Sequence, residues 1–354
     1  MTILLAACGA RTSLGGAADG GDAGVEASAP ACALSDMSTW RTERFRDQGD
    51  YERAAVAIAD APWVALKPRG GDVILVELGV DPQQGIVFRN RIAIAGASAY
   101  PVALDVDERR FVLVTTTGIN WNGDLELWRV DRTDGNVQHA SVGGPSPNPE
   151  STIESAVGIA GDDIVLGYAR AAENQGTVEL RDDHLAILQS IPVPDVSFTA
   201  ARADPGAVDL YLGADARLHV QGGAVTSLPI DPSWQVIGGQ AGFRVEMGDQ
   251  LRLRQGQDTW AGAWPDTQIS PPAVVRTDGA RAAFSLETEL SGVVGWQRAP
   301  GELDWLRVEP APDAPGFGAA LLPVIESGRL GFFYLGLEMP HPEQPLRYYG
   351  LACP

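Results

Sequence analysis

The chain has 354 residues, of which 45% are hydrophobic and 20% charged, so it is long enough for a large core and too hydrophobic for wholesale disorder. Its 46 acidic residues outnumber its 26 basic ones, and the net charge of −20 argues against nucleic acid as a partner, because phosphate binding needs clustered cations. No run of eighteen apolar residues occurs, so the sequence predicts no transmembrane helix.

The chain opens with a short apolar stretch that ends in Leu5-Ala6-Ala7-Cys8, followed by Gly9. This stretch resembles a bacterial lipobox, in which the cysteine is acylated and becomes the mature N-terminus. The basic region and longer apolar segment that normally precede a lipobox are missing here, so either the true start lies upstream or Cys8 is a buried cysteine in a short apolar start. Residues 9–31 consist mainly of Gly, Ala, Ser and Asp, which predicts a flexible tether.

The opening Cys8-Gly9-Ala10-Arg11-Thr12-Ser13-Leu14-Gly15 is similar to the start of many predicted lipoproteins of high-GC Gram-negative soil bacteria, and the preference for Arg over Lys fits such a genome. The resemblance implies lipid anchoring through Cys8 outside the cytoplasm. With Gly9 after Cys8, the sorting rule of enteric bacteria implies the outer membrane, on its periplasmic side or at the cell surface. We therefore expect a truncated signal peptide in residues 1–8, a disordered tether in 9–31 and one folded domain in 32–354.

Three cysteines is an odd number for an exported protein. With Cys8 assigned to the lipid, Cys32 and Cys353 remain, one at each end of the folded region. An oxidising compartment would let them pair and fasten the two ends together. Two free, buried thiols are the alternative.

The folded region alternates with a two-residue period, as in Val73–Leu78 and Phe111–Val114, and no stretch shows a helical stripe. Short apolar runs between Gly, Pro, Asp and Asn predict an all-β fold. A tight turn followed by a strong apolar run recurs about every 43 residues, a period typical of four-stranded propeller blades. Seven such units predict a seven-bladed β-propeller; six or eight blades, or a pair of β-sandwiches, are the alternatives. The turns lie near Gly71, Glu108, Gly161, Pro205, Ala241, Gly279 and Ser327, and the second strands are predicted at 72–78, 111–117, 164–169, 208–212, 243–246, 282–286 and 329–335.

The last unit contains three predicted strands, at 318–325, 329–335 and 346–352, and lacks an outer strand. We expect the N-terminal run 52–58 to supply it and to lead into 63–66, the first inner strand of the first unit. Closure by an N-terminal strand removes an exposed strand edge.

Motifs that carry chemistry are missing from the sequence, which contains no Gly-x-Ser-x-Gly, phosphate-binding glycine loop, His-Glu-x-x-His or Cys-x-x-Cys. The segment 131–136 resembles the start of a calcium loop but lacks the third ligand position and the closing Glu, so a type I turn is favoured. The sequence therefore favours a binding protein without a cofactor. The alternative is a hydrolase or lyase that acts on glycans or lactones. Its catalytic groups would be carboxylates at the mouth of the propeller, and Ca²⁺ could bind where several of these carboxylates converge.

Sorting the predicted loops by face indicates an uneven distribution of charge. In a propeller, the loops between second and third strands and the connections between blades lie on the same face. These fourteen predicted loops contain fifteen acids and no Lys or Arg. An acidic face of this kind attracts cations and positively charged partners; a chain at −20 that is acidic nearly everywhere is the alternative explanation. The acids are Asp60, Asp81, Glu150, Glu173, Asp195, Asp215, Asp231, Asp249, Asp266, Glu287, Glu289, Glu309, Asp313, Glu338 and Glu343. The opposite face is predicted to carry Lys67, Arg69, Arg89, Arg91, Arg109, Arg110, Arg132, Arg281, Arg298 and Arg329.

One loop of the acidic face, 118–123, places a Trp between two Asn residues, an arrangement suited to stacking on a sugar or clasping a peptide. A Trp folded back over the blade edge is the alternative. The expected function is that of a membrane-anchored, monomeric, rigid binding platform for a protein, peptide or glycan of the envelope. The candidate ligand residues are Asn120, Trp121, Asn122, Asp81, Glu173, Asp215, Asp249, Glu287, Glu289, Glu338 and His341.

Overall fold

A computed structural model of the chain describes seventeen segments of the folded region, separated by short gaps. Cys8 and the tether 9–31 lie outside the described residues, as do Cys32 and Cys353. No helix of the described part is long and apolar enough to cross a membrane. The described segments are 33–38, 51–68, 70–81, 85–117, 123–142, 153–170, 175–194, 198–204, 206–212, 216–228, 235–240, 242–263, 269–288, 292–308, 319–326, 329–336 and 346–352.

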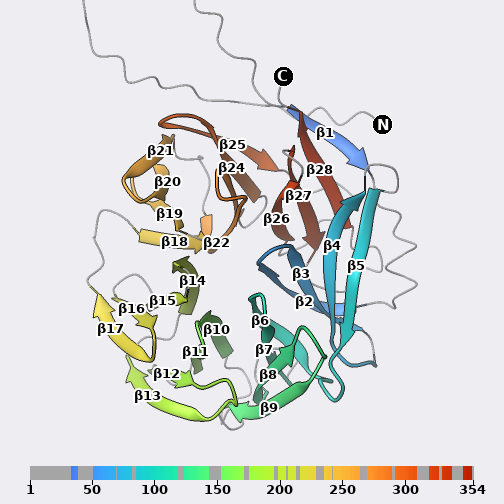
Figure 1. The fold of residues 1–354 in the computed structure, drawn as a ribbon, viewed down its shortest axis with the longest axis vertical. Coiled ribbons are helices and arrows are strands. Elements are labelled where there is room, and N and C mark those ends of the chain that lie inside the picture. The colour runs from blue at the N-terminus through green and yellow to red at the C-terminus, as the bar shows by residue number, and fades with distance from the viewer. Residues whose placement is uncertain are drawn as a thin grey trace, which may run out of the picture.

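Within these segments all regular structure is β-strand, and the strands form sheets that stand around a common centre (Figure 1). In the first half of the chain the strands are β1 Ala33–Ser38, β2 Tyr51–Ile58, β3 Pro62–Pro68, β4 Ile74–Asp81, β5 Gly85–Ala93, β6 Tyr100–Val106, β7 Arg110–Thr116, β8 Leu125–Asp131, β9 Val137–Val142, β10 Ile153–Ala160, β11 Asp163–Arg170, β12 Gln175–Arg181 and β13 Ile187–Val193. In the second half they are β14 Phe198–Asp204, β15 Ala207–Leu212, β16 Ala216–Gln221, β17 Ala224–Leu228, β18 Gln235–Gln240, β19 Phe243–Met247, β20 Leu251–Gln255, β21 Asp258–Gly262, β22 Ile269–Thr277, β23 Ala282–Thr288, β24 Gly292–Ala299, β25 Glu302–Val308, β26 Ala319–Glu326, β27 Arg329–Gly336 and β28 Leu346–Ala352.

The described strands group into four-stranded antiparallel units that follow one another around the ring. Five units are separate sheets, and two more, β18–β21 and β22–β25, are joined at their outer edges by one parallel bridge between Ala261 and Glu302. In each unit the first strand lies at the centre of the ring and the last at the rim (Figure 1). The chain is therefore a β-propeller, and the predicted all-β propeller fold is confirmed.

The middle strands read as continuous apolar runs because each is covered on both sides. On β7, Phe111 and Leu113 belong to the apolar cluster shared with the preceding sheet. Val112 and Val114 belong to the cluster shared with the following sheet. A strand that is buried on both faces reads as a continuous apolar run, whereas the rim strand β13 is exposed over most of its length.

The predicted closing strand was assigned to the wrong segment. Residues 52–58 belong to β2, which pairs with β3 and begins the first sheet, and the last sheet is completed instead by β1, which pairs antiparallel with β28. The run 51–58 is alanine-rich and alternates, so it packs as an inner strand, with Ala55 and Ala57 buried against the next sheet. The sequence Ala-Leu-Ser-Asp-Met-Ser of β1 carries no comparable apolar alternation and gave no strand signal.

This error shifts the first sheet by one strand. Residues 72–78 lie mainly in β4, the third strand of its sheet, whereas the other six predicted second strands coincide with β7, β11, β15, β19, β23 and β27, each the second of its sheet. Closure of the last sheet by an N-terminal strand is nevertheless what the structure shows.

The register of the closing pair suggests a covalent bond. Ala33 lies opposite Ala352 at the end of the β1–β28 ladder, so the next pair in the same register would be Cys32 and Cys353. Opposed residues of antiparallel strands have Cα atoms about 4.5–5.5 Å apart, which is within the range that a disulfide spans. We propose that these two cysteines form a disulfide that fixes β1 in the ring.

We expect the Cys8→Ser protein, unfolded without reductant, to contain no free thiol. A bond that closes roughly 320 residues contributes about 5 kcal/mol on the chain-entropy model. At about 2.1 cal/mol/K per residue, reduction should then lower Tm by about 7 °C, and Cys353→Ser should match the reduced protein. Two titratable thiols in the oxidised protein would contradict the pairing.

Candidate functional site

The two faces of the ring differ in the length of their connections. On the face that we call the turn face, where first strands lead into second strands and third strands into fourth, no connection between described strands exceeds five residues. On the other face, here called the mouth, the segments 39–50, 143–152 and 309–318 span ten to twelve residues. Long loops displayed by a rigid scaffold are where proteins usually place binding residues.

Three charged residues lie on a different face from the one predicted. Asp60, in the β2–β3 connection, and Asp81, the last residue of β4, were predicted at the mouth but lie on the turn face. Lys67, predicted opposite the mouth, lies near the mouth end of β3, where its buried ammonium donates to the carbonyls of Pro68 and Gly71. The reason is the strand order of the first sheet, in which β3 is the second strand and β4 the third. Arg69 lies outside the described residues.

The structure describes few of the predicted ligand residues. Asp249 lies exposed in the β19–β20 connection at the mouth, and Glu287 lies in β23 opposite Gly292, near the mouth end of that strand. Asp81 ends β4 on the turn face and is partly exposed. Asn120, Trp121, Asn122, Glu173, Asp215, Glu289, Glu338 and His341 lie outside the described residues.

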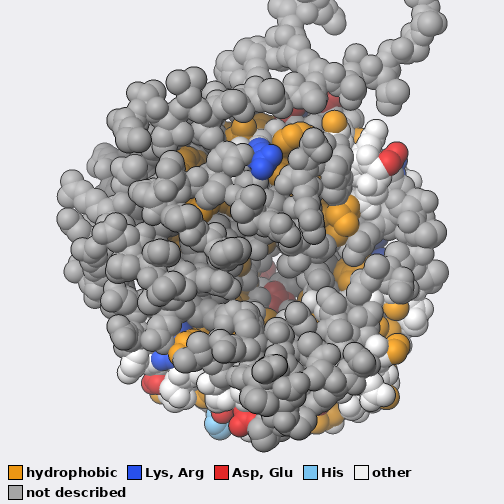
Figure 2. Space-filling model, turned by 180° about the vertical axis from the view of Figure 1, so that it is seen from behind, with side chains coloured by type: hydrophobic (Ala, Val, Ile, Leu, Met, Phe, Trp, Pro, Cys, Tyr) orange, Lys and Arg blue, Asp and Glu red, His pale blue; other side chains and the backbone are white. Residues whose placement is uncertain are grey.

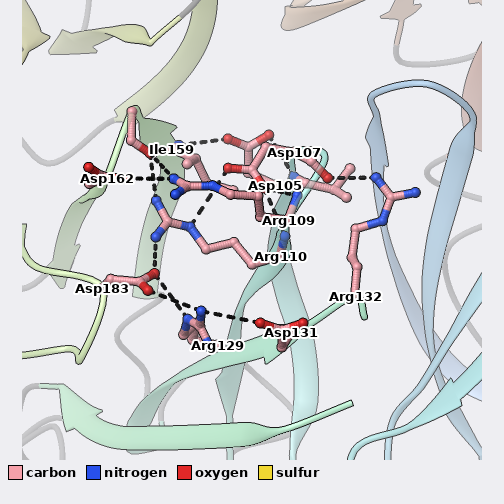
Figure 3. Close-up of polar contacts among 12 residues, drawn as sticks. Asp105, Asp107, Arg109, Arg110, Arg129, Asp131, Arg132, Ile159, Asp162 and Asp183 are labelled. Atoms are coloured by element: carbon pink, nitrogen blue, oxygen red, sulfur yellow. Dashed lines mark hydrogen bonds and ion pairs between the residues drawn. The ribbon is translucent and has the colours of Figure 1, made fainter. Parts of the chain in front are cut away.

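Arg109, Arg110 and Arg132, three of the cations predicted opposite the mouth, lie on the turn face, where they and Arg129 join neighbouring sheets (Figure 3). Asp183, in the β12–β13 turn, accepts hydrogen bonds from Arg110 and Arg129 of the preceding sheet. The Arg129 contact is bidentate, with Nε and Nη2 each 3.0 Å from a carboxylate oxygen. Arg110 is 1% exposed and also donates to the Gly161 carbonyl at 2.7 Å. Burial lowers the pKa of Arg110, although the nearby Asp107 opposes that shift.

A second connection joins the first two sheets through Arg132. Its guanidinium donates to the Asp107 carbonyl at 2.6 Å and to Asp60 Oδ2 at 3.0 Å. It also lies 5.3 Å from the centre of the Trp63 ring, within the range of a cation–π contact. Burial acts to raise the pKa of Asp60, but the hydrogen bond and charge of Arg132 outweigh it and hold that pKa below its usual value.

The turn-face end of the central channel is bridged by side chains from across the ring. Gln240, at the end of β18, donates to the carbonyls of Ile58 and Ala59 at 3.2 and 3.1 Å. Arg276 of β22 donates to the carbonyls of Ala59 and Asp60. Three inner strands thus meet at the β2–β3 connection. Seen from behind, the molecule is hollowed at its centre, with acidic side chains visible at depth (Figure 2).

The segment 131–136, which resembles the start of a calcium loop, is a turn, as predicted. Asp131 Oδ1 accepts a hydrogen bond from Thr133 N at 2.7 Å, Asp134 Oδ1 accepts one from Asn136 N at 2.8 Å, and Gly135 adopts a φ of 71°. These carboxylates stabilise the turn itself. Within the described residues, no group of three or more His, Cys, Asp or Glu side chains is arranged to hold a metal.

Arg109, Arg110 and Arg132 lie on the turn face as predicted, whereas Arg129, Arg276 and the partners of these arginines were not predicted. Asp183 and Gln240 carry no local signal, because their contacts join residues 54 to 182 positions apart. The arrangement on this face is one of satisfied ion pairs and hydrogen bonds between sheets, and such contacts position strands rather than perform chemistry. The ligand-binding surface is therefore to be sought at the mouth.

Comparison with known proteins supports the fold without giving a family. No protein-family model matches the chain, and no curated protein matches it. The structure is similar to the WD40 domain of coronin from Toxoplasma gondii, with 10% identity, a TM-score of 0.50 and coverage of 92% of this chain and 86% of that chain. Also similar are the β-propeller domain of the Trilobed protease from Pyrococcus furiosus (10% identity, TM-score 0.49, 85% and 94% covered) and an α-L-arabinanase of Penicillium chrysogenum complexed with arabinobiose (11%, 0.47, 92% and 99%). At this identity the likeness shows a β-propeller fold alone.

The ion-pair cluster makes a specific prediction about stability. Asp183→Asn should lower the free energy of unfolding by about 1–3 kcal/mol, since it leaves the buried Arg110 and the largely buried Arg129 without their shared carboxylate. The lower part of that range is favoured because the Asp183 side chain is 36% exposed. The measurement is urea unfolding of each variant.

The matched control for this experiment is Asp162→Asn. Asp162 pairs with Arg109 on the same face, but its side chain is 82% exposed, so its loss should change the unfolding midpoint much less. Equal effects of the two substitutions would contradict a special role for Asp183.

Proposed function

We propose that the chain is a lipid-anchored, extracytoplasmic binding platform whose mouth engages a protein, peptide or glycan of the envelope. The observation that carries this proposal is the asymmetry of the two faces. Connections on the turn face are short and their side chains bind neighbouring sheets, whereas the mouth carries the long segments. A ring that is rigid on one face and elaborated on the other is suited to presenting a recognition surface.

The chain order supports anchoring at the closed edge of the ring. The lipobox-like Cys8 is followed by the tether 9–31, and β1 begins at Ala33, directly after it. Because β1 completes the last sheet, a lipid on Cys8 would attach to the ring through its closing strand, and the flexible tether would leave the mouth free to orient.

Recognition at the mouth is assigned to the loop 118–123 and the acidic residues around the opening. Trp121 offers an aromatic face for a sugar ring or an apolar peptide side chain, and the two flanking amides supply directional hydrogen bonds. The acids favour a partner with positive groups, and their attraction weakens with salt.

Anchoring is tested by metabolic labelling with palmitate in a Gram-negative host, with a basic region and an apolar segment placed upstream of residue 1. We expect label on the unsubstituted chain and none on Cys8→Ser, since the thiol is the acylation site. Equal labelling of the two, or label on neither, would refute the lipid anchor.

Binding is tested by chemical cross-linking of the full chain in envelope fractions, followed by identification of the captured protein, peptide or glycan. Trp121→Ala should reduce capture at least tenfold, while Leu188→Ala, at a site 55% exposed on the rim strand β13, should leave it unchanged. Capture that is insensitive to Trp121 would refute this surface. Turnover of a glycan or lactone by the same preparation would replace the binding platform with an enzyme.

A further inference from the structure

The turn between β12 and β13 contains an unusual backbone conformation. Among the described residues, Leu185 is the only one other than glycine that has a positive φ, at 65°. In this left-handed region the Cβ atom comes too close to the following carbonyl oxygen, so the conformation is unfavourable for leucine. The turn therefore stores strain at one residue.

Comparable turns of the ring place glycine in this region. In each of the other four described connections between a third and a fourth strand, every positive φ belongs to a glycine, which has no Cβ and adopts it without strain. These glycines are Gly135, Gly222, Gly223, Gly256 and Gly301. The β12–β13 turn departs from this pattern, so we looked for a contact that the leucine side chain provides.

The hydrogen bonds of the turn itself do not need that side chain. Leu185 N donates to the Asp182 carbonyl at 3.0 Å, and Asp182 N donates to the Ala186 carbonyl at the same distance. Asp182 Oδ1 accepts hydrogen bonds from His184 N and Ala186 N at 2.9 and 2.8 Å. At position 185 the turn uses only main-chain atoms, so a glycine would fit it better.

The side chain of Leu185 is used instead in the seam with the preceding sheet, β6–β9. Leu185 is 4% exposed and belongs to the apolar cluster that the two sheets share. Val112 and Leu127 are members of that cluster from the preceding sheet. The free energy gained by burying a leucine side chain is similar in size to the cost of the left-handed backbone, and so can offset it.

The same turn directs a charged side chain to the same sheet. Asp183, two residues before Leu185, accepts hydrogen bonds from Arg110 of β7 and Arg129 of β8 (Figure 3). One turn therefore makes an ionic and an apolar contact with its neighbour, from side chains two positions apart.

A buried arginine fixes the main chain of the turn from within its own sheet. Arg181, which is 3% exposed, donates to the Leu185 carbonyl at 2.8 Å. Its Nε donates to Glu179 Oε2 at 2.7 Å, which holds the guanidinium in place. The amide and the carbonyl of Leu185 are thus both hydrogen-bonded, so the residue is held by its main chain as well as by its side chain.

We propose that the β12–β13 turn is a latch between the sheets β6–β9 and β10–β13, in which docking of Asp183 and Leu185 holds the turn in its strained conformation. The ionic and the apolar contact act as one unit, because each keeps the turn where the other needs it. The mouth segment 143–152 runs between these two sheets, so the latch fixes the two strands that carry its ends. This role goes beyond the binding function and does not depend on it.

The first test is urea unfolding of the full chain with Leu185→Gly or Leu185→Ala. Both substitutions remove the buried side chain, but only glycine adopts the left-handed conformation without strain. We expect the glycine variant to have the higher unfolding midpoint, although glycine normally lowers stability by adding freedom to the unfolded chain. An equal or higher midpoint for Leu185→Ala would overturn the latch, because the backbone at this position would then carry no strain.

The second test is amide hydrogen exchange of the turn in Asp183→Asn, which leaves Leu185 in place and decides the matter even if the Leu185 variants do not fold. The amides of Leu185 and Ala186 bond to Asp182 rather than to Asp183. We expect both amides to exchange at least threefold faster than in the unsubstituted chain, because loss of the ionic contact releases a turn that is under strain.

The matched control for hydrogen exchange is Asp278→Asn. The Asp278 side chain is 32% exposed, against 36% for Asp183, and it pairs with Arg281 within another turn of the same face. This substitution should leave exchange in the β12–β13 turn unchanged. Unchanged exchange in Asp183→Asn, or equal acceleration in both variants, would overturn the proposal.

Discussion

The structure depends on closure of the ring. Each sheet buries both of its faces against neighbours, so no sheet is stable unless the sheets on both sides of it are in place. The first and last sheets meet that requirement only if the ring is complete, and the apolar cluster that joins them contains Val64, Leu322 and Phe333. The antiparallel pairing of β1 with β28 puts residues from both ends of the chain into one sheet, and so makes closure part of the hydrogen-bonded structure.

Closure also explains why the two faces of the ring differ in structure. The short connections of the turn face bring Arg110, Arg129 and Asp183 within reach of one another, and these contacts fix the angle between adjacent sheets. Gln240 and Arg276 extend the same function across the channel to the β2–β3 connection. With the turn face fixed in this way, the longer mouth segments can vary without loss of the ring.

Much of the architecture could be predicted from the sequence, because the apolar run Phe111 to Val114 and its repeats record burial on both sides of a strand. The closing strand could not be found in this way. Among the described strands β1 pairs with β28 alone, and its six residues gain their structure from that pairing rather than from any pattern of their own. The alanine-rich run 51–58 has the stronger pattern and was assigned the role instead.

The candidate site shows the same limit. Arg109 and Arg281 were located correctly because a turn between two strands is a local signal. The contacts between sheets were not, since the link between Arg129 and Asp183 depends on how two sheets stand beside each other. Asp60, Asp81 and Lys67 were assigned to the wrong faces because the misplaced closing strand shifted the first sheet by one strand.

The most direct test of ring closure is urea unfolding of the full chain with residues 33–38 replaced by a Gly-Ser segment of equal length. Reductant is present throughout, so that the contribution of the β1 strand is measured apart from that of any disulfide. The control carries the same replacement at 20–25, within the tether. If β1 closes the ring, the first variant should have a clearly lower unfolding midpoint than the unsubstituted chain, and the midpoint of the control should be unchanged. An unchanged midpoint for both would contradict the view that β1 holds the propeller together.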